Sequence, residues 1–297
     1  MKSGDAINRS GAGGSEPLPA DPRTRWASLD LAARNAAYDN NAAVANSASL
    51  IDARNRTSAA YRAAHPANLD LAYGPAERTA FDLYPAPDPK APCLVFIHGG
   101  YWQRNSREVF ACFAEGPAAA GWSVAIPGYS LAPQATLTAI VAEIGSALDW
   151  LAEHGASYGV DGPLIVAGWS AGAQLAALHL AHPRVVAGLA ISGIYDLEPL
   201  RDTSLNGALN LTDVEIADFS PLRRPVVRKP LTIAYGDAEL PTLVHDARRF
   251  HELRSQGGAP GQILAIAGAD HFSILQDLQR PDGALVRAAV SLVDALA

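Results

Sequence analysis

A serine between two glycines is the first candidate for chemistry in this sequence. Gly168-Trp169-Ser170-Ala171-Gly172 follows an apolar run at 164–167 and precedes an Ala-rich segment at 173–181. This order predicts a strand, a tight turn and a helix, with Ser170 at the apex as an exposed nucleophile. The glycines would let helix and strand cross closely, where a Cβ would clash. A capping serine in an ordinary turn would give the same pattern, so both interpretations stay open.

Two glycines after another apolar run could supply the backbone donors that acyl transfer needs. Gly99 and Gly100 follow the run 93–97, and N–H groups there can point at a ligand without interference from side chains. Together with the N–H of Ala171, they would hold the oxyanion of a tetrahedral intermediate. An ordinary turn is the alternative. We expect the adjacent His98 to form a structural wall rather than to act as a base.

A serine nucleophile also needs a base and an acid that orients the base. Of the eight histidines, only His271 lies just past a late apolar run. The acid is open between Asp237 and Glu239, which both follow the run 231–235, and we favour Glu239 because it lies further along the loop toward the histidine. Asp270 is a weaker third choice, because neighbours in sequence usually point apart. The order serine, acid, histidine is that of the α/β-hydrolases.

Alternating strands and helices must bring these residues together. Short apolar runs predict strands that are buried on both faces, and helical periodicity separates them, most clearly at 134–154. This alternation predicts an α/β fold with a mainly parallel central sheet and helices on both faces. Of two earlier β segments, 69–73 and 79–84, the second alternates as a sheet edge would. The six later runs are 93–97, 122–126, 164–167, 185–191, 231–235 and 263–267, and further helices are expected from about 242 and 282.

Composition divides the chain into three parts. Residues 1–22 are rich in Gly, Ser, Pro and Ala, which predicts a disordered tail. Residues 23–66 are Ala-rich and predict an N-terminal helical arm with a break near 39–41. Residues 67–297 form the expected catalytic domain. Within it, the polar stretch 196–228 interrupts the alternation, and we expect a cap-like insertion over the carboxyl edge of the sheet, where ligands bind.

The composition also excludes several classes of function. With 23 Lys and Arg against 30 Asp and Glu, the formal net charge of −7 argues against binding to nucleic acid or an anionic membrane. Two cysteines, Cys93 and Cys112, are too few for a disulfide scaffold or a Cys-based zinc site, and we expect both in the core. We find no transmembrane stretch and no secretory signal, so we expect a cytoplasmic protein. The oligomeric state stays open, a homodimer included.

From about residue 70 onward the sequence resembles the α/β-hydrolase superfamily. The segments His98-Gly99-Gly100-Tyr101-Trp102 and 127–133 are similar to those of HGG-type esterases and of arylformamidases (kynurenine formamidases), and a tryptophan at this place is typical of the second group. The segments 38–41 and 58–62 resemble bacterial arylformamidase-like members, which extends the resemblance to about residue 30. In that family the acid stands three residues after the strand-end glycine, at the place of Glu239, although many members have Asp there.

The resemblance implies hydrolysis of an N-formyl aryl amide, as in the conversion of N-formylkynurenine to kynurenine and formate, with neither metal nor organic cofactor. Tyr101, Trp102 and Trp169 could form a wall for the aryl group, and we favour Trp102, although all three could pack in the core instead. A carboxylesterase acting on short-chain or aryl esters would use the same residues, and a non-catalytic small-molecule binder could retain them. Resemblance of fold alone does not settle the substrate.

Overall fold

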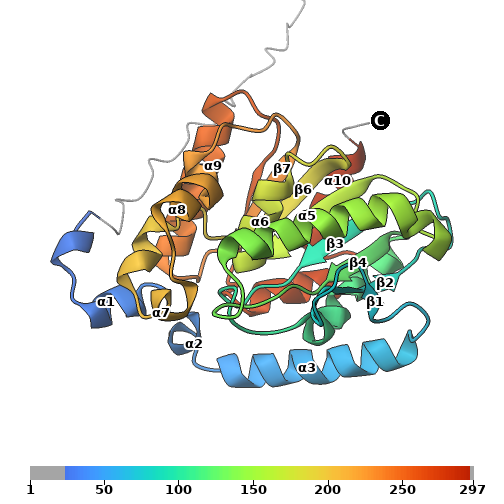
Figure 1. The fold of residues 1–297 in the computed structure, drawn as a ribbon, viewed down its shortest axis with the longest axis horizontal. Coiled ribbons are helices and arrows are strands. Elements are labelled where there is room, and N and C mark those ends of the chain that lie inside the picture. Colours follow the sequence, from blue (N-terminus) through green and yellow to red (C-terminus); the bar gives the residue numbers. More distant parts are fainter. Residues whose placement is uncertain (1–23, 295–297) are drawn as a thin grey trace, which may run out of the picture.

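The structure is a computed structural model that describes residues 24–294, so the predicted tail at 1–22 lies outside the described residues. The described chain has an α/β fold, in which helices cover both faces of a central sheet (Figure 1). This arrangement confirms the predicted fold class. The strands are β1 (Leu71–Ala72), β2 (Ala80–Tyr84), β3 (Cys93–Ile97), β4 (Ser123–Pro127), β5 (Leu164–Trp169), β6 (Val185–Ile191), β7 (Leu231–Gly236) and β8 (Ile263–Ile266).

The sheet is mainly parallel, with the strand order β1-β2-β4-β3-β5-β6-β7-β8. β2 pairs antiparallel with β1 and with β4, and the neighbours from β4 to β8 pair in parallel. The loops that follow β3 and β5 to β8 therefore meet at one edge of the sheet. The connections after β3 and β5 leave toward opposite sides, which opens a crevice at the carboxyl ends of these two strands.

Helices cover the sheet as two layers. The α-helices are α1 (Leu31–Ala36), α2 (Asn40–Ala43), α3 (Ser47–Ala64), α4 (Glu115–Ala119), α5 (Leu137–His154), α6 (Ala171–His179), α7 (Asn206–Leu209), α8 (Asp213–Phe219), α9 (Pro241–Gln256) and α10 (Ala284–Asp294). The 3₁₀ helices are η1 (Trp26–Ser28), η2 (Arg107–Ala114), η3 (Gly155–Tyr158), η4 (Glu198–Asp202), η5 (Pro221–Arg223) and η6 (Ser273–Leu278). One core lies between the sheet and α5, α6 and α9, and the other between the sheet and η2, η6 and α10.

β3 shows why the central strands are apolar without interruption. Cys93, Val95 and Ile97 belong to the first core, whereas Leu94 and Phe96 belong to the second. Because side chains alternate across a strand, a strand covered on both faces needs an apolar residue at every position. Cys93 and Cys112 are both buried, as expected.

The expectation of a sheet edge at 79–84 is wrong. β2 lies inside β1 in the sheet, and all of its residues are buried. The polar residue that suggested an exposed face, Asp82, has no exposed side chain and accepts from Nε of Arg62 at 2.8 Å and from Nε of Arg107 at 3.2 Å. Paired guanidinium groups compensate the burial of this carboxylate. The ion pair between Arg62 and Asp82 also fastens α3, which carries Arg62, to the sheet.

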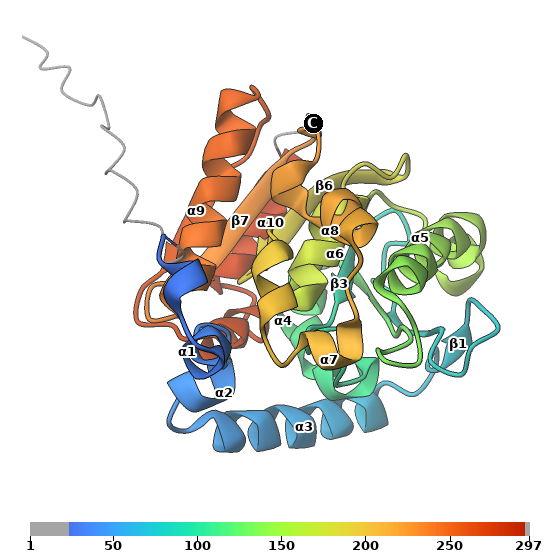
Figure 2. The same ribbon diagram turned by 60° about the vertical axis from the view of Figure 1, so that its left-hand side comes forward.

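The N-terminal segment 26–64 folds as η1, α1, α2 and α3, and is called the arm below. In the ribbon, α1 and α2 lead into the long α3, which runs along one side of the molecule (Figures 1 and 2). α3 packs along η2. Residues 196–228 form η4, α7, α8 and η5. Among the described helices, none has both the length and the apolar character needed to cross a membrane.

Candidate active site

Ser170 stands at the turn between β5 and α6, as the sequence predicts. Its backbone has φ 57° and ψ −120°, a strained conformation that non-glycine residues adopt mainly at functional sites. A Cβ at Gly168 would overlap the carbonyl oxygen of Gly172, and a Cβ at Gly172 would overlap that of Ile97. Both glycines are therefore required by the close crossing of α6 over the strands. The predicted strand–turn–helix is confirmed.

The loop after β3, residues 98–105, lies against this turn and is called the glycine loop below. A Cβ at Gly99 would stand 2.9 Å from the Cβ of Ser170, and Gly100 has φ +126°, where glycine is favoured. Among residues 24–294, no group accepts a hydrogen bond from the backbone N–H of Gly99, Gly100 or Ala171. These donors lie beside the serine at the positive end of α6, where an anionic oxygen would be stabilised.

The loop after β7 brings a carboxylate to the histidine of the loop after β8. Oε2 of Glu239 lies 3.1 Å from Nδ1 of His271, and only 4% of the histidine side chain and none of the glutamate side chain is exposed. The other oxygen, Oε1, accepts from the backbone N–H of Gly236 at 2.8 Å and from the hydroxyl of Ser192. Donors on both oxygens hold the carboxylate in one orientation toward the ring.

Ser192 is a residue that the sequence analysis missed. It directly follows β6 and has φ +54°, a conformation that is uncommon for a residue other than glycine. A residue placed immediately after a buried central strand is at the edge where the other candidates lie, and this position was the available signal. Its hydroxyl donates to the carboxylate that faces the histidine.

The two other carboxylates considered from the sequence point elsewhere. Asp237 is exposed, and its Oδ1 accepts from the backbone N–H of Gly268 at 2.7 Å. Oδ1 of Asp270 accepts from the backbone N–H groups of Phe272 and Ser273, at 2.8 Å each. Both side chains therefore stabilise turns, and of the three carboxylates the structure pairs Glu239 with the histidine.

Comparison with known proteins finds hydrolases among the proteins to which this chain is similar. A family model described as BD-FAE matches residues 81–184. Kynurenine formamidase of Danio rerio is 26% identical over 241 residues, covering 76% of this chain and 81% of the relative. That of Drosophila melanogaster is 27% identical over 217 residues, covering 67% and 72%. The crystal structure of a candidate thioesterase from Silicibacter sp. tm1040 is 28% identical, with a TM-score of 0.77 and coverage of 86% and 98%.

This chain is an arylformamidase-like α/β-hydrolase. The BD-FAE match includes the glycine loop and the turn at Ser170, and it ends before Glu239 and His271. Glu239 and His271 lie in the loops that follow β7 and β8, and His271 lines the same cavity as Ser170.

His98 has a structural role in this hydrolase, as expected. It is fully buried, its ring stacks on that of Tyr129 with centroids 4.2 Å apart, and its Nδ1 lies 2.9 Å from the carbonyl oxygen of Gly99. Burial lowers the pKa of His98 to about 3. An imidazole that stays neutral and braces the glycine loop is unsuited to act as the base.

The three aromatic residues expected around the aryl group have different places in the hydrolase. Trp102, the favoured one, does not line the cavity: it is fully buried, and its Nε1 donates to Oε1 of Gln174 at 3.2 Å. Tyr101 and Trp169 do line the cavity. Nε1 of Trp169 also donates to the carbonyl oxygen of His271 at 2.8 Å, so the residue before the serine fixes the backbone of the histidine.

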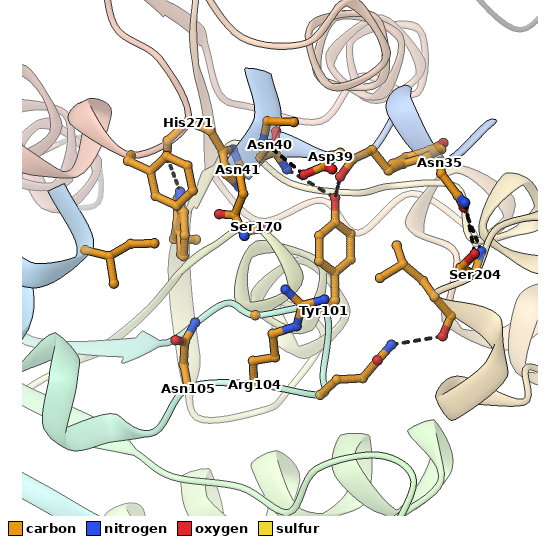
Figure 3. Close-up of a pocket in the computed structure, with 18 of the residues that line it drawn as sticks. Asn35, Asp39, Asn40, Asn41, Tyr101, Arg104, Asn105, Ser170, Ser204 and His271 are labelled. Atoms are coloured by element: carbon orange, nitrogen blue, oxygen red, sulfur yellow. Dashed lines mark hydrogen bonds between the residues drawn. The ribbon is translucent and has the colours of Figure 1, made fainter. Parts of the chain in front are cut away.

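The hydrolase has a cavity of about 740 Å³ in front of these residues. Ser170 and His271 both line it, and Figure 3 shows Arg104 pointing into the same space. The sequence analysis placed the insertion 196–228 over this edge, and Ser204 and Leu205 of that stretch do line the cavity. The arm contributes Asn35, Tyr38, Asp39, Asn40, Asn41, Ala42, Ile51 and Arg54.

The sequence did not predict that the arm would form part of the cavity wall. The hydroxyl of Tyr101 donates to the carbonyl oxygen of Tyr38 and accepts from Nδ2 of Asn40 at 3.1 Å. Asn35 and Ser204 exchange two hydrogen bonds, of 2.9 Å and 2.8 Å, between the arm and the insertion. The available signal was the cluster of polar residues at 38–41, which interrupts an otherwise Ala-rich segment.

Proposed function

We propose that this hydrolase cleaves N-formyl aryl amides, releasing formate and an aryl amine, with Ser170, His271 and Glu239 as its catalytic triad. The observation that carries the proposal is the buried contact of 3.1 Å between Oε2 of Glu239 and Nδ1 of His271, a histidine that lines the same cavity as the strained serine. The kynurenine formamidases among its relatives support a formamide as the substrate.

The first half of the reaction forms an acyl-enzyme. Oγ of Ser170 attacks the formyl carbon while Nε2 of His271 accepts the hydroxyl proton, and Glu239 stabilises the imidazolium through Nδ1. The backbone N–H groups of Gly100 and Ala171, with that of Gly99 beside them, form the oxyanion hole for the negative oxygen. The C–N bond then breaks, and the histidine returns the proton to the nitrogen of the leaving amine.

The second half of the reaction removes the formyl group from Ser170. Water attacks the formyl ester on Ser170 and gives a proton to His271, and the same donors stabilise the second tetrahedral oxyanion. Collapse of this intermediate releases formate, and the histidine returns the proton to the serine oxygen. Apart from the attacking water, the side chains and backbone groups named here account for every proton transferred in the reaction.

A second candidate is the hydrolysis of short-chain or aryl esters. The candidate thioesterase that shares the fold supports it, because thioesters and esters react at the same kind of carbonyl through the same triad. An ester releases an alcohol or a phenol, which leaves more readily than an amine. Ester turnover alone would therefore not separate the two functions.

The decisive assay compares kcat/KM for N-formylkynurenine with that for p-nitrophenyl acetate. We expect formate release from the formamide, and we expect Ser170→Ala to lower kcat on both substrates by about 10⁴-fold or more. A fluorophosphonate should label the native protein and fail to label the variant. Hydrolysis of the ester without any release of formate would contradict the formamidase and favour the carboxylesterase. A variant with undiminished activity would contradict the triad itself.

A further inference from the structure

Arg104 differs from its neighbours in the glycine loop because its side chain has no hydrogen-bond partner among the described residues. The four other side chains from position 101 to position 105 each hydrogen-bond to another part of the protein. Arg104 is exposed and lines the cavity, and its side chain makes no hydrogen bond or ion pair with any residue in the described range 24–294. The four used side chains are Tyr101 with Tyr38, Trp102 with Gln174, Gln103 with Leu205, and Asn105 with Gly99.

The position of Arg104 relates it to the proposed chemistry. The carbonyl oxygen of Gly100 accepts from the backbone N–H of Arg104 at 3.0 Å, so the arginine lies on the same tight turn as a proposed donor of the oxyanion hole. In Figure 3 its side chain lies between Asn105 and Tyr101, and it lines the same cavity as Ser170. Its guanidinium can therefore contact a part of the substrate beyond the scissile bond.

A second arginine strengthens the positive potential of the cavity. Arg54 lines the same cavity, its guanidinium donates to Oδ1 of Asn55, and it lies 4.3 Å from the ring centroid of Phe110. Burial lowers the pKa of Arg54 to about 10, so the group is still charged at neutral pH. Asp39 is the carboxylate among the lining residues. In a chain with a net charge of −7, two arginines against one aspartate make this cavity a local site for anions.

We propose that Arg104 binds a carboxylate on the leaving group of the substrate, so that this hydrolase selects N-formyl aryl amides that carry an acidic function. The inference rests on the proposed function: a formyl group bears only hydrogen on its carbonyl, so the anion must belong to the amine side. A guanidinium offers a planar pair of donors that matches a carboxylate in two parallel hydrogen bonds. The surrounding loop is held by its other side chains, so its backbone loses little conformational entropy when the arginine binds the carboxylate.

The test uses two formamides that differ by one carboxylate. They are N-formylkynurenine and the analogue in which hydrogen replaces its α-carboxylate, with formate release as the readout. A hydrogen-bonded charge pair predicts that the native protein prefers the acid by about 10-fold or more in kcat/KM. Arg104→Gln should remove most of this preference, mainly through a higher KM for the acid, because the contact is made in the ground state and the transition state alike. Arg104→Lys should restore part of it.

Arg56→Gln is the matched control. Arg56 is exposed on α3, belongs to the arm and does not line the cavity, so this variant should keep the native preference. Equal kcat/KM for the two formamides in the native protein, or an equal loss on both in Arg104→Gln, would overturn the anion site while leaving the formamidase intact. Hydrolysis of p-nitrophenyl acetate with no formate from either compound would overturn the proposed function, and the inference with it.

Discussion

The two sides of the cavity are built in different ways. The side that carries Ser170 consists of strand ends and the turns that follow them, where glycine is required because a Cβ would overlap a neighbouring backbone. The opposite side consists of the arm and the insertion 196–228, which are far apart in sequence and meet through side chains. Asn35 and Ser204, for example, are 169 residues apart and share two hydrogen bonds.

This difference separates chemistry from recognition. A reacting serine, its base and its donors must keep their distances, and the ends of hydrogen-bonded strands provide that rigidity. A substrate wall needs only to fit one leaving group, and segments outside the sheet can change without disturbing the core. We therefore expect substitutions in the strand ends and their tight turns to lower kcat or stability. Substitutions in the arm, and of side chains such as Arg104 that only contact the substrate, should raise KM.

The largest effect is expected at the carboxylate that faces His271. Glu239→Gln should lower kcat by about 10³- to 10⁴-fold, because an amide cannot stabilise the imidazolium and can hold the wrong tautomer of the ring. Asp237→Asn is the matched control, since Asp237 is exposed and bonds to Gly268, and we expect it to keep near-native kcat. Steady-state kinetics of both variants at one pH make the comparison, and a larger loss in Asp237→Asn would reverse the assignment of the acid.

An effect of intermediate size is expected from a single methyl group at the turn of the serine. In Gly172→Ala, the new Cβ would overlap the carbonyl oxygen of Ile97, and overpacking of this kind lowers the free energy of unfolding by about 1–3 kcal/mol or more. Gly207→Ala, in α7 of the insertion, is the control because a Cβ there would meet no atom within 4 Å. Urea denaturation should show a clear loss of stability in the first variant and none in the second. Equal stability of the two variants would show that the strand side is packed no more closely than the insertion.

The strand side could be predicted from the sequence because its geometry demands particular residue types. Glycines at 168 and 172 around the serine, after a buried strand, suit a tight strand-to-helix turn, and parallel strands bring His271 to the same edge. The choice of Glu239 over Asp237 rested on its place in the loop and on the resemblance to a family. The ring–carboxylate contact that supports it depends on how two loops fold against each other.

The remaining details depend on tertiary contacts that no local pattern records. Trp102 was expected in the cavity, but consecutive positive φ angles of 53° and 57° at Tyr101 and Trp102 turn the loop and direct the indole into the core. Asp82 suggested an exposed strand because nothing in its own segment reveals that Arg62 and Arg107 neutralise it. In the same way, the arm could be predicted as helical but not as a wall of the site.

The smallest expected effect tests whether the arm shapes the site. Tyr101→Phe removes the hydroxyl that bonds to Tyr38 and Asn40 of the arm, and the loss of this tie should raise KM by about 2- to 10-fold with little change in kcat. Tyr158→Phe, at a half-buried tyrosine in η3 that does not line the cavity, is the matched control. An unchanged KM in Tyr101→Phe would mean that the arm covers the cavity without contacting the substrate, whereas a loss confined to kcat would place Tyr101 on the strand side of the comparison.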